Sequence, residues 1–248
     1  MRRRCAGRAG LKTRGGIFAW LRVRYHATFM QNTSRVEAFI NRLGNGFQKH
    51  WLGAIVTGLF VYSLLPFAAP VLMKVGLTGP AQLIYTPYKF VCHTLGFRSF
   101  WLFGPQPVYS RGDDPSGGGD FQVYSGINPA GFTGQLQARD FQGSEAMGYK
   151  TALCQRDIFI YFTMALNGLL FSFVRGRKRL LPWWLLIAIG VIPVGLDGFS
   201  QMLSQPPFNF IPFRESVWQL RALTGALFGF GMAWLVFPLL EETMKGGQ

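Results

Sequence analysis

The sequence predicts an all-α, polytopic integral membrane protein with four transmembrane helices and one further short interfacial or re-entrant helix. Two observations carry this prediction: only 15% of the 248 residues are charged while 49% are hydrophobic, and the charged residues leave four long gaps. Ordinary globular proteins carry about 25% charged residues, and about 20 apolar residues cross the hydrocarbon core of a bilayer. The four gaps lie between Lys49 and Lys74, between Asp157 and Arg175, between Arg179 and Asp197, and between Arg221 and Glu241.

The composition also excludes several other classes of protein. With 24 Phe, 7 Trp and 8 Tyr, the chain is too apolar to be disordered. Its three cysteines, at positions 5, 92 and 154, are too few for a disulfide scaffold. A soluble helical bundle needs a polar stripe on each helix, which the stretch 226–237 lacks. The net charge of +14 does not indicate a nucleic-acid partner, because no recognised motif accompanies the basic residues.

Positive charge sets the predicted orientation in the bilayer. Residues 1–50 hold eleven Lys or Arg against one acid, Glu37, and such basic segments stay in the cytoplasm. A mitochondrial transit peptide is the alternative for this start, but retention and contact with anionic lipid explain the same charges. The first transmembrane helix follows over residues 51–73. The basic turn at 174–180 is also placed inside, so both termini, including a tail at 241–248, are predicted to be cytoplasmic.

Two segments between the first span and the others have different predicted roles. Residues 81–93 are apolar but short and contain Lys89. Counting them as a fifth span would force one basic segment outward, so we expect a short interfacial helix. Residues 104–150 form a long Gly- and Asp-rich extracytoplasmic loop, and loops of that length are typically functional or disordered. Residues 151–240 form a three-helix transmembrane bundle.

Ionisable residues are predicted to gather at the outer end of this bundle. The basic turn fixes the inner ends of the second and third spans, so Asp157 and Asp197 lie at similar depth. Ionisable groups at a bilayer boundary normally face the bundle and pair with one another. We therefore expect the two carboxylates to meet Arg156 and Arg221, with Gln201 filling the remaining hydrogen bonds.

A second group at the same end contains potential metal ligands. Cys92 and His93 precede the long loop and can fold back towards Cys154 and Asp157. Thiolate, imidazole and carboxylate together form a ligand set for zinc or copper. The spacing matches no zinc signature, so a disulfide between Cys92 and Cys154 and two independent thiols remain open.

Two glycines on the fourth span have a separate expected role. Gly225 and Gly229 show the small-x-x-x-small spacing that lets membrane helices approach closely. We expect them to pack inside the bundle.

Several ordered blocks of the sequence resemble a prokaryotic domain-of-unknown-function family of small predicted membrane proteins. The family pattern reads C-H, R-S-F, C-x-R-C, D-G-x-x-Q and R-x-x-T-G. In this chain the blocks are Cys92-His93, Arg98-Ser-Phe100, Cys154-Gln-Arg-Asp157, Asp197-Gly-Phe-Ser-Gln201 and Arg221-Ala-Leu-Thr-Gly225.

The resemblance covers roughly residues 90–232 and has two departures. Asp157 stands where the family usually has its second cysteine, and residues 111–150 look like an insertion. The resemblance implies a prokaryotic plasma membrane as the location and implies no activity.

Three functions remain open from the sequence. The first is a non-catalytic structural or accessory component of a membrane assembly, which binds a protein partner or a second copy through its transmembrane helices. The second is a metal-handling or thiol-redox protein that uses Cys92, His93, Cys154 and Asp157. The third is a small cation-coupled transporter centred on Asp197. There is no phosphate-binding glycine loop, serine nucleophile motif or H-E-x-x-H sequence to indicate an enzyme.

Overall fold

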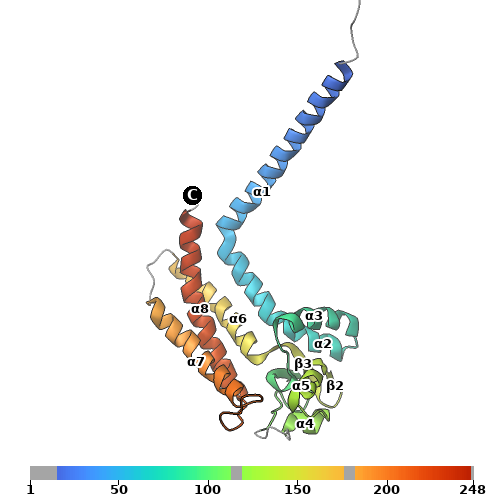
Figure 1. The fold of residues 1–248 in the computed structure, drawn as a ribbon, viewed down its shortest axis with the longest axis vertical. Helices are drawn as coiled ribbons and strands as arrows, with labels where there is room; N and C mark the ends of the chain where they lie inside the picture. The colour runs from blue at the N-terminus through green and yellow to red at the C-terminus, as the bar shows by residue number, and fades with distance from the viewer. Residues whose placement is uncertain (1–15, 113–118, 176–181, 247–248) are drawn as a thin grey trace, which may run out of the picture. The chain divides into compact units, whose positions relative to one another are not determined.

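The computed structural model describes residues 16–112, 119–175 and 182–246 and is mostly helical (Figure 1). The chain divides into two units, Met1–Trp51 and Leu52–Gln248. The first unit contributes the N-terminal part of helix α1 (Gly16–Leu64). All other elements, and every site discussed below, belong to the second unit.

Within the residues that the structure describes, four helical segments are long and apolar enough to cross a membrane. They are Gly46–Lys74, Gln155–Val174, Trp183–Leu203 and Trp218–Lys245. Large apolar side chains such as Phe173 and Leu196 are exposed on these segments, as expected of helices that face lipid rather than water. The predicted class, a mostly helical protein with four candidate spans, is confirmed.

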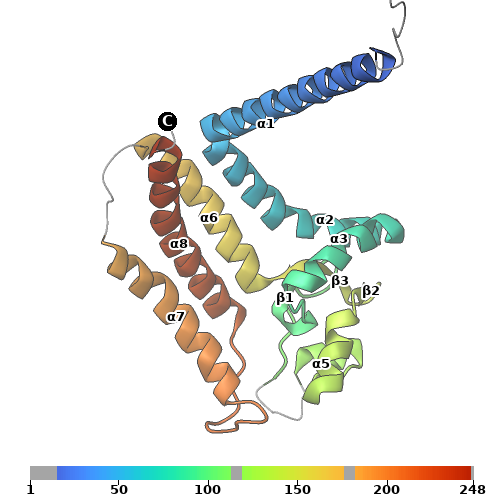
Figure 2. The same ribbon diagram turned by 45° about the horizontal axis from the view of Figure 1, so that its top comes forward.

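Three of these helices form a bundle. Helix α8 (Trp218–Gly246) packs against both α6 (Gln155–Val174) and α7 (Trp183–Leu203), as Figures 1 and 2 show. Close approach depends on glycine: a Cβ atom at Gly225 would lie 2.6 Å from the carbonyl oxygen of Arg156, and one at Gly229 would clash with the carbonyl of Ile160. Both predicted packing glycines thus face α6.

The segment before the bundle contains elements that the sequence did not predict. After η1 (Leu65–Phe67), α2 (Ala68–Lys74), α3 (Thr78–Val91) and η2 (Gly96–Arg98) comes a three-stranded antiparallel sheet in the order β1-β3-β2. Its strands are β1 (Ser99–Leu102), β2 (Gly143–Ser144) and β3 (Gly148–Cys154). Strand β3 is buried along nearly its whole length, so it lacks the alternation that identifies a strand in a sequence.

Residues 104–150 also contain more structure than a single loop. They include α4 (Asp120–Ser125), α5 (Gly131–Asp140), β2 and the start of β3. The reason is a buried aromatic core in which Trp101, Tyr109 and Phe121 pack together with Met147. Aromatic side chains bury enough apolar surface to order a segment of this size.

Lys150 on β3 joins three parts of this region. Its buried ammonium donates hydrogen bonds to the carbonyl oxygens of Thr94 (2.7 Å), Ala138 (3.3 Å) and Arg139 (2.6 Å). Burial lowers the pKa of Lys150 to about 7, and the positive charge of Lys89 acts in the same direction. A buried polar group with this many partners fixes the segments that it touches.

Helix α3 contains most of the segment predicted as a short interfacial helix. Leu83, Phe90 and Val91 on this helix are exposed. The helix ends at Val91 and leaves Cys92 and His93 beyond it. The basic start at residues 1–15 and most of the basic turn, residues 176–180, lie outside the described residues, so the orientation in the bilayer stays a prediction.

Candidate functional site

Polar side chains converge where strand β3 leads into α6, at the end of the bundle formed by the last turns of α7 and the first turn of α8. The residues come from the η2–β1 segment, from α6 and α7, and from the connection 204–217. We call this the polar end. It consists of two charged centres and a group of thiols.

The first charged centre surrounds Asp197, whose side chain is 3% exposed. One carboxylate oxygen, Oδ1, accepts hydrogen bonds from Arg214 Nη2 (2.9 Å) and Ser216 Oγ (2.5 Å). The other, Oδ2, accepts from Arg156 and from Gln201 Nε2, the latter at 3.1 Å. Each carboxylate oxygen of Asp197 therefore accepts two hydrogen bonds from within the protein.

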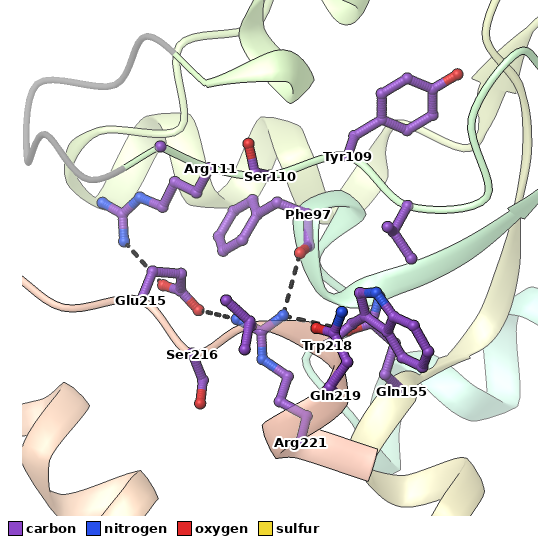
Figure 3. A pocket seen from close by; sticks show the side chains of 13 residues that line it. Phe97, Tyr109, Ser110, Arg111, Gln155, Glu215, Ser216, Trp218, Gln219 and Arg221 are labelled. Atoms are coloured by element: carbon purple, nitrogen blue, oxygen red, sulfur yellow. Dashed lines mark hydrogen bonds and ion pairs between the residues drawn. The ribbon is translucent and has the colours of Figure 1, made fainter.

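The second charged centre surrounds Glu215, which the sequence analysis missed. Arg98 forms a bidentate pair with it, through Nε to Oε1 (2.8 Å) and Nη2 to Oε2 (2.9 Å). Arg221 also donates to Oε1, and Arg111 Nη1 lies 3.6 Å from Oε2 (Figure 3). Burial alone would raise the pKa of Glu215, but the charge and hydrogen bonds of Arg98, with Arg221 and Arg111, hold it below the ordinary value.

The two centres are linked, and they differ from the predicted pairing at Arg221 and at Asp157, which lies beside Cys92 and Cys154 instead of in either centre. Arg98 Nη2 donates to Gln201 Oε1 (3.3 Å) and thereby connects the Glu215 centre to the Asp197 centre. Arg156, Asp197 and Gln201 meet, as their spacing predicted. Arg221 instead binds Glu215, Gln155 Oε1 (3.2 Å) and the carbonyl of Phe97 (3.3 Å).

The thiol cluster consists of Cys92, Cys154 and Asp157. The two Sγ atoms and one carboxylate oxygen all lie within 4.8 Å of one another. Cys92 follows α3, Cys154 ends β3 directly before α6, and Asp157 lies in the first turn of that helix. The fold therefore brings together three residues from the predicted ligand set.

Both cysteines are free in the structure. A hydrogen bond with Cys92 is the largest cause that raises the pKa of the Cys154 thiol, followed by burial and the negative charge of Asp157. The thiol rather than the thiolate is thus the stable form of Cys154 without a further partner. The backbone N–H of Thr94 donates to Cys92 Sγ (3.5 Å) and helps to hold it.

The thiol cluster opens into a pocket of about 300 Å³. His93 lines this pocket but is not within the group of three close ligand atoms. Three arginines, Arg98, Arg156 and Arg221, line it as well. The pocket thus combines sulfur and oxygen ligands with positive charge.

Fold and site together define a polytopic membrane protein with a buried arginine–carboxylate network beside a pair of thiols. Residues 139–235 match the family described as predicted membrane protein (DUF2085). An uncharacterized protein of Methanocaldococcus jannaschii, MJ1492, is 23% identical over 203 residues, which cover 79% of this chain and 95% of the relative. No solved structure matches the chain. The resemblance noted in the sequence blocks is confirmed.

Proposed function

We propose that this protein is an integral membrane protein that binds zinc or copper at the thiol cluster. The single observation that carries the proposal is the convergence of Cys92, Cys154 and Asp157 within 4.8 Å. We further propose a prokaryotic plasma membrane with both termini in the cytoplasm, from the distribution of basic residues. The metal site then faces the extracytoplasmic side.

The donor set suits a thiophilic metal. Zinc takes four ligands in a tetrahedron, and ligands about 2.3 Å from the ion lie about 3.8 Å from one another. Side-chain movements of about 1 Å would bring the three groups to that spacing. His93, the next residue after Cys92, or a water molecule supplies the fourth position.

The nearby arginines do not oppose this proposal. A metal ion binds thiolate, so each cysteine loses a proton on binding. A divalent ion that displaces the protons of Cys92 and Cys154 leaves the net charge of the pocket unchanged. The surroundings of Cys154 raise the pKa of its thiol, so the metal must displace a proton from it. Metal binding should therefore weaken as the pH falls.

The test is elemental analysis of the detergent-purified protein. We expect close to one zinc or copper per chain in the wild type and loss of that metal in Cys154→Ser. Cys5→Ser is the matched control, since it removes a cysteine outside the described residues and should retain the metal. Thiol titration in parallel identifies the alternatives. A metal-free wild type would contradict the proposal, and two fewer free thiols than cysteines would then indicate a disulfide.

A second candidate is a non-catalytic accessory component of a membrane assembly. It is favoured by the Asp197 centre, in which four side chains satisfy one carboxylate. Such a centre stabilises one arrangement of helices and leaves no oxygen for a transported cation. It therefore gives no support to a cation-coupled transporter.

The two candidates are separable by mutation. If the protein is only an accessory component, replacing Cys92 and Cys154 by serine leaves folding and association with a partner or a second copy intact. Cross-linking in native membranes measures that association. Loss of cross-linked product in the double variant would contradict a purely structural role.

A further inference from the structure

A second pocket at the polar end has chemistry that the thiol cluster does not explain. It has a volume of about 300 Å³, and Glu215 and Arg221 are among the residues that line it (Figure 3). The side chains that matter here are those of Phe97, Tyr109, Arg111, Gln155, Trp218 and Arg221. We call it the arginine pocket.

Positive charge exceeds negative charge around this pocket. Glu215 is the one carboxylate in contact with Arg98, Arg111 and Arg221 among the described residues. Asp197 cannot balance the excess, because Arg156 and Arg214 already bind it. Burying a charge without a partner of opposite sign is destabilising, so the excess of positive charge favours the binding of an anion.

Arg111 has a hydrogen-bond donor that no described residue accepts from. Its side chain is only 3% exposed, yet its buried Nε has no hydrogen-bond partner in the part of the chain that the structure describes. Nη1 reaches Gln205 Oε1 (3.3 Å) and lies 3.6 Å from Glu215. A buried N–H left without a partner costs free energy.

The aromatic neighbours hold this guanidinium in place. The guanidinium carbon of Arg111 lies 4.9 Å from the ring centre of Phe213 and 5.5 Å from that of Phe97. Burial lowers the pKa of Arg111, although Glu215 acts against this effect. A guanidinium whose position is fixed and whose positive charge is only partly neutralised is preorganised to bind an oxyanion.

The apolar side of the pocket indicates what the anion is attached to. Trp218 is the first residue of α8, at the start of a candidate membrane span, and the neighbouring Val217 is exposed. Tryptophan is enriched at the boundary between membrane and water. A phosphate group carried by an apolar molecule would meet both the arginines and this surface.

We propose that the arginine pocket binds a phosphate group, with Arg111 and Arg221 as its ligands. The phosphate belongs either to the headgroup of an anionic lipid or to free inorganic phosphate. Guanidinium forks match phosphate oxygens in pairs, and the excess charge accepts a phosphate without leaving an anion unpaired. Arg221 lines both pockets, whereas Arg111 does not line the pocket of the thiol cluster, so Arg111 is the residue that tests this proposal separately from metal binding.

The test compares thermal unfolding midpoints of the full chain, in a neutral detergent for the first arm and in lipid nanodiscs for the second. One arm uses inorganic phosphate against chloride at equal ionic strength. The other uses nanodiscs of phosphatidylglycerol against nanodiscs of phosphatidylcholine. At about ten times the dissociation constant, binding should raise the midpoint of the wild type by about 3–6 °C in at least one arm. A response to phosphatidylglycerol alone assigns a lipid headgroup, and a response to inorganic phosphate assigns the free ion.

Two variants identify the pocket as the cause. Arg111→Gln should abolish the response. Arg175→Gln, which removes an arginine paired with Glu241 on α8, should keep the response in full. Equal midpoints of the wild type in both comparisons would overturn the proposal, and so would a full response in Arg111→Gln. A wild type that responds in neither comparison overturns the proposal even if Arg111→Gln does not fold, and metal content of the same samples tests the thiol cluster separately.

Discussion

Arg156, in the first turn of α6, forms a buried ion pair with Asp197, near the end of α7, across 41 positions of sequence. Both helices pack against α8, and the pair joins them directly at the polar end. Arg214 and Ser216 add the connection that leads into α8. The carboxylate of Asp197 thus holds all three helices of the bundle at one point.

Asp197→Leu should strongly destabilise the protein. The change leaves the guanidiniums of Arg156 and Arg214 without their carboxylate, and breaking a buried pair in this way costs about 3–5 kcal/mol. We expect a low yield and a lower thermal unfolding midpoint in detergent. Asp140→Asn is the control, because Asp140 pairs with Lys89 on the exposed surface and such pairs contribute about 0–1 kcal/mol. A normal yield and midpoint for Asp197→Leu would refute this account of the Asp197 centre.

Gly229→Ala should weaken the packing of α8 against α6 and lower the thermal unfolding midpoint. The added Cβ atom would clash with the backbone carbonyl of Ile160, and overpacking of this kind costs about 1–3 kcal/mol. Gly195→Ala on α7 is the matched control, since nothing lies within 4 Å of its Cβ position. Because alanine forms helix better than glycine by about 1 kcal/mol, the control should be neutral or stabilising. Equal unfolding midpoints for the two variants would show that Gly229 is not a close contact.

The stability of the protein should fall in acid through Glu215. Its pKa is lower in the folded chain than the ordinary value of 4.5, so the unfolded chain binds the proton first. The stabilisation from Glu215 is complete above pH 4.5 and is lost as the pH falls through the lower, folded pKa. We expect the thermal unfolding midpoint of the wild type to fall as the pH is lowered below 4.5, and we expect Glu215→Gln to lack this pH-dependent fall. Glu145→Gln, at an exposed pair with Lys74, should change the same curve much less.

Asp157→Cys should strengthen metal binding at the thiol cluster. A third thiolate in place of a carboxylate is a softer ligand and favours zinc and copper(I). We expect at least about a tenfold lower dissociation constant for zinc, which equals about 1.4 kcal/mol, in competition with a coloured chelator. Asp157→Asn should weaken binding, since it removes an anionic ligand. The prediction fails if both variants bind zinc as the wild type does.

The bundle could be predicted because membrane-spanning helices are long stretches without charged residues. Charge-free stretches identified α6, α7 and α8, and equal distances from the basic turn placed Asp157 and Asp197 at the same end. Those arguments depend only on helix geometry and on the cost of charge in a bilayer. They needed no knowledge of how the connections fold.

The rest of the site depends on those connections. Glu215 is the only acid between Asp197 and Glu241 in the sequence, and that isolation near Arg221 was the available signal. Nothing local showed that residues 204–217 fold back, with Ser204 and Arg214 bonded to each other, or that Arg98 and Arg111 would reach Glu215. Long-range pairs of this kind arise from the packing of the sheet and the aromatic core, for which no periodic pattern exists.

The Glu215 centre also sets an order of events during synthesis. Arg98 and Arg111 leave the ribosome well before their carboxylate, because Glu215 follows the third candidate span in the chain. At about 5–20 residues per second, the delay from Arg111 to Glu215 is roughly 5–20 s. During that interval these arginines must remain hydrated. The region around the sheet therefore reaches its final state only after α7 has been made, which makes closure of the Glu215 centre a late step in the biogenesis of the protein.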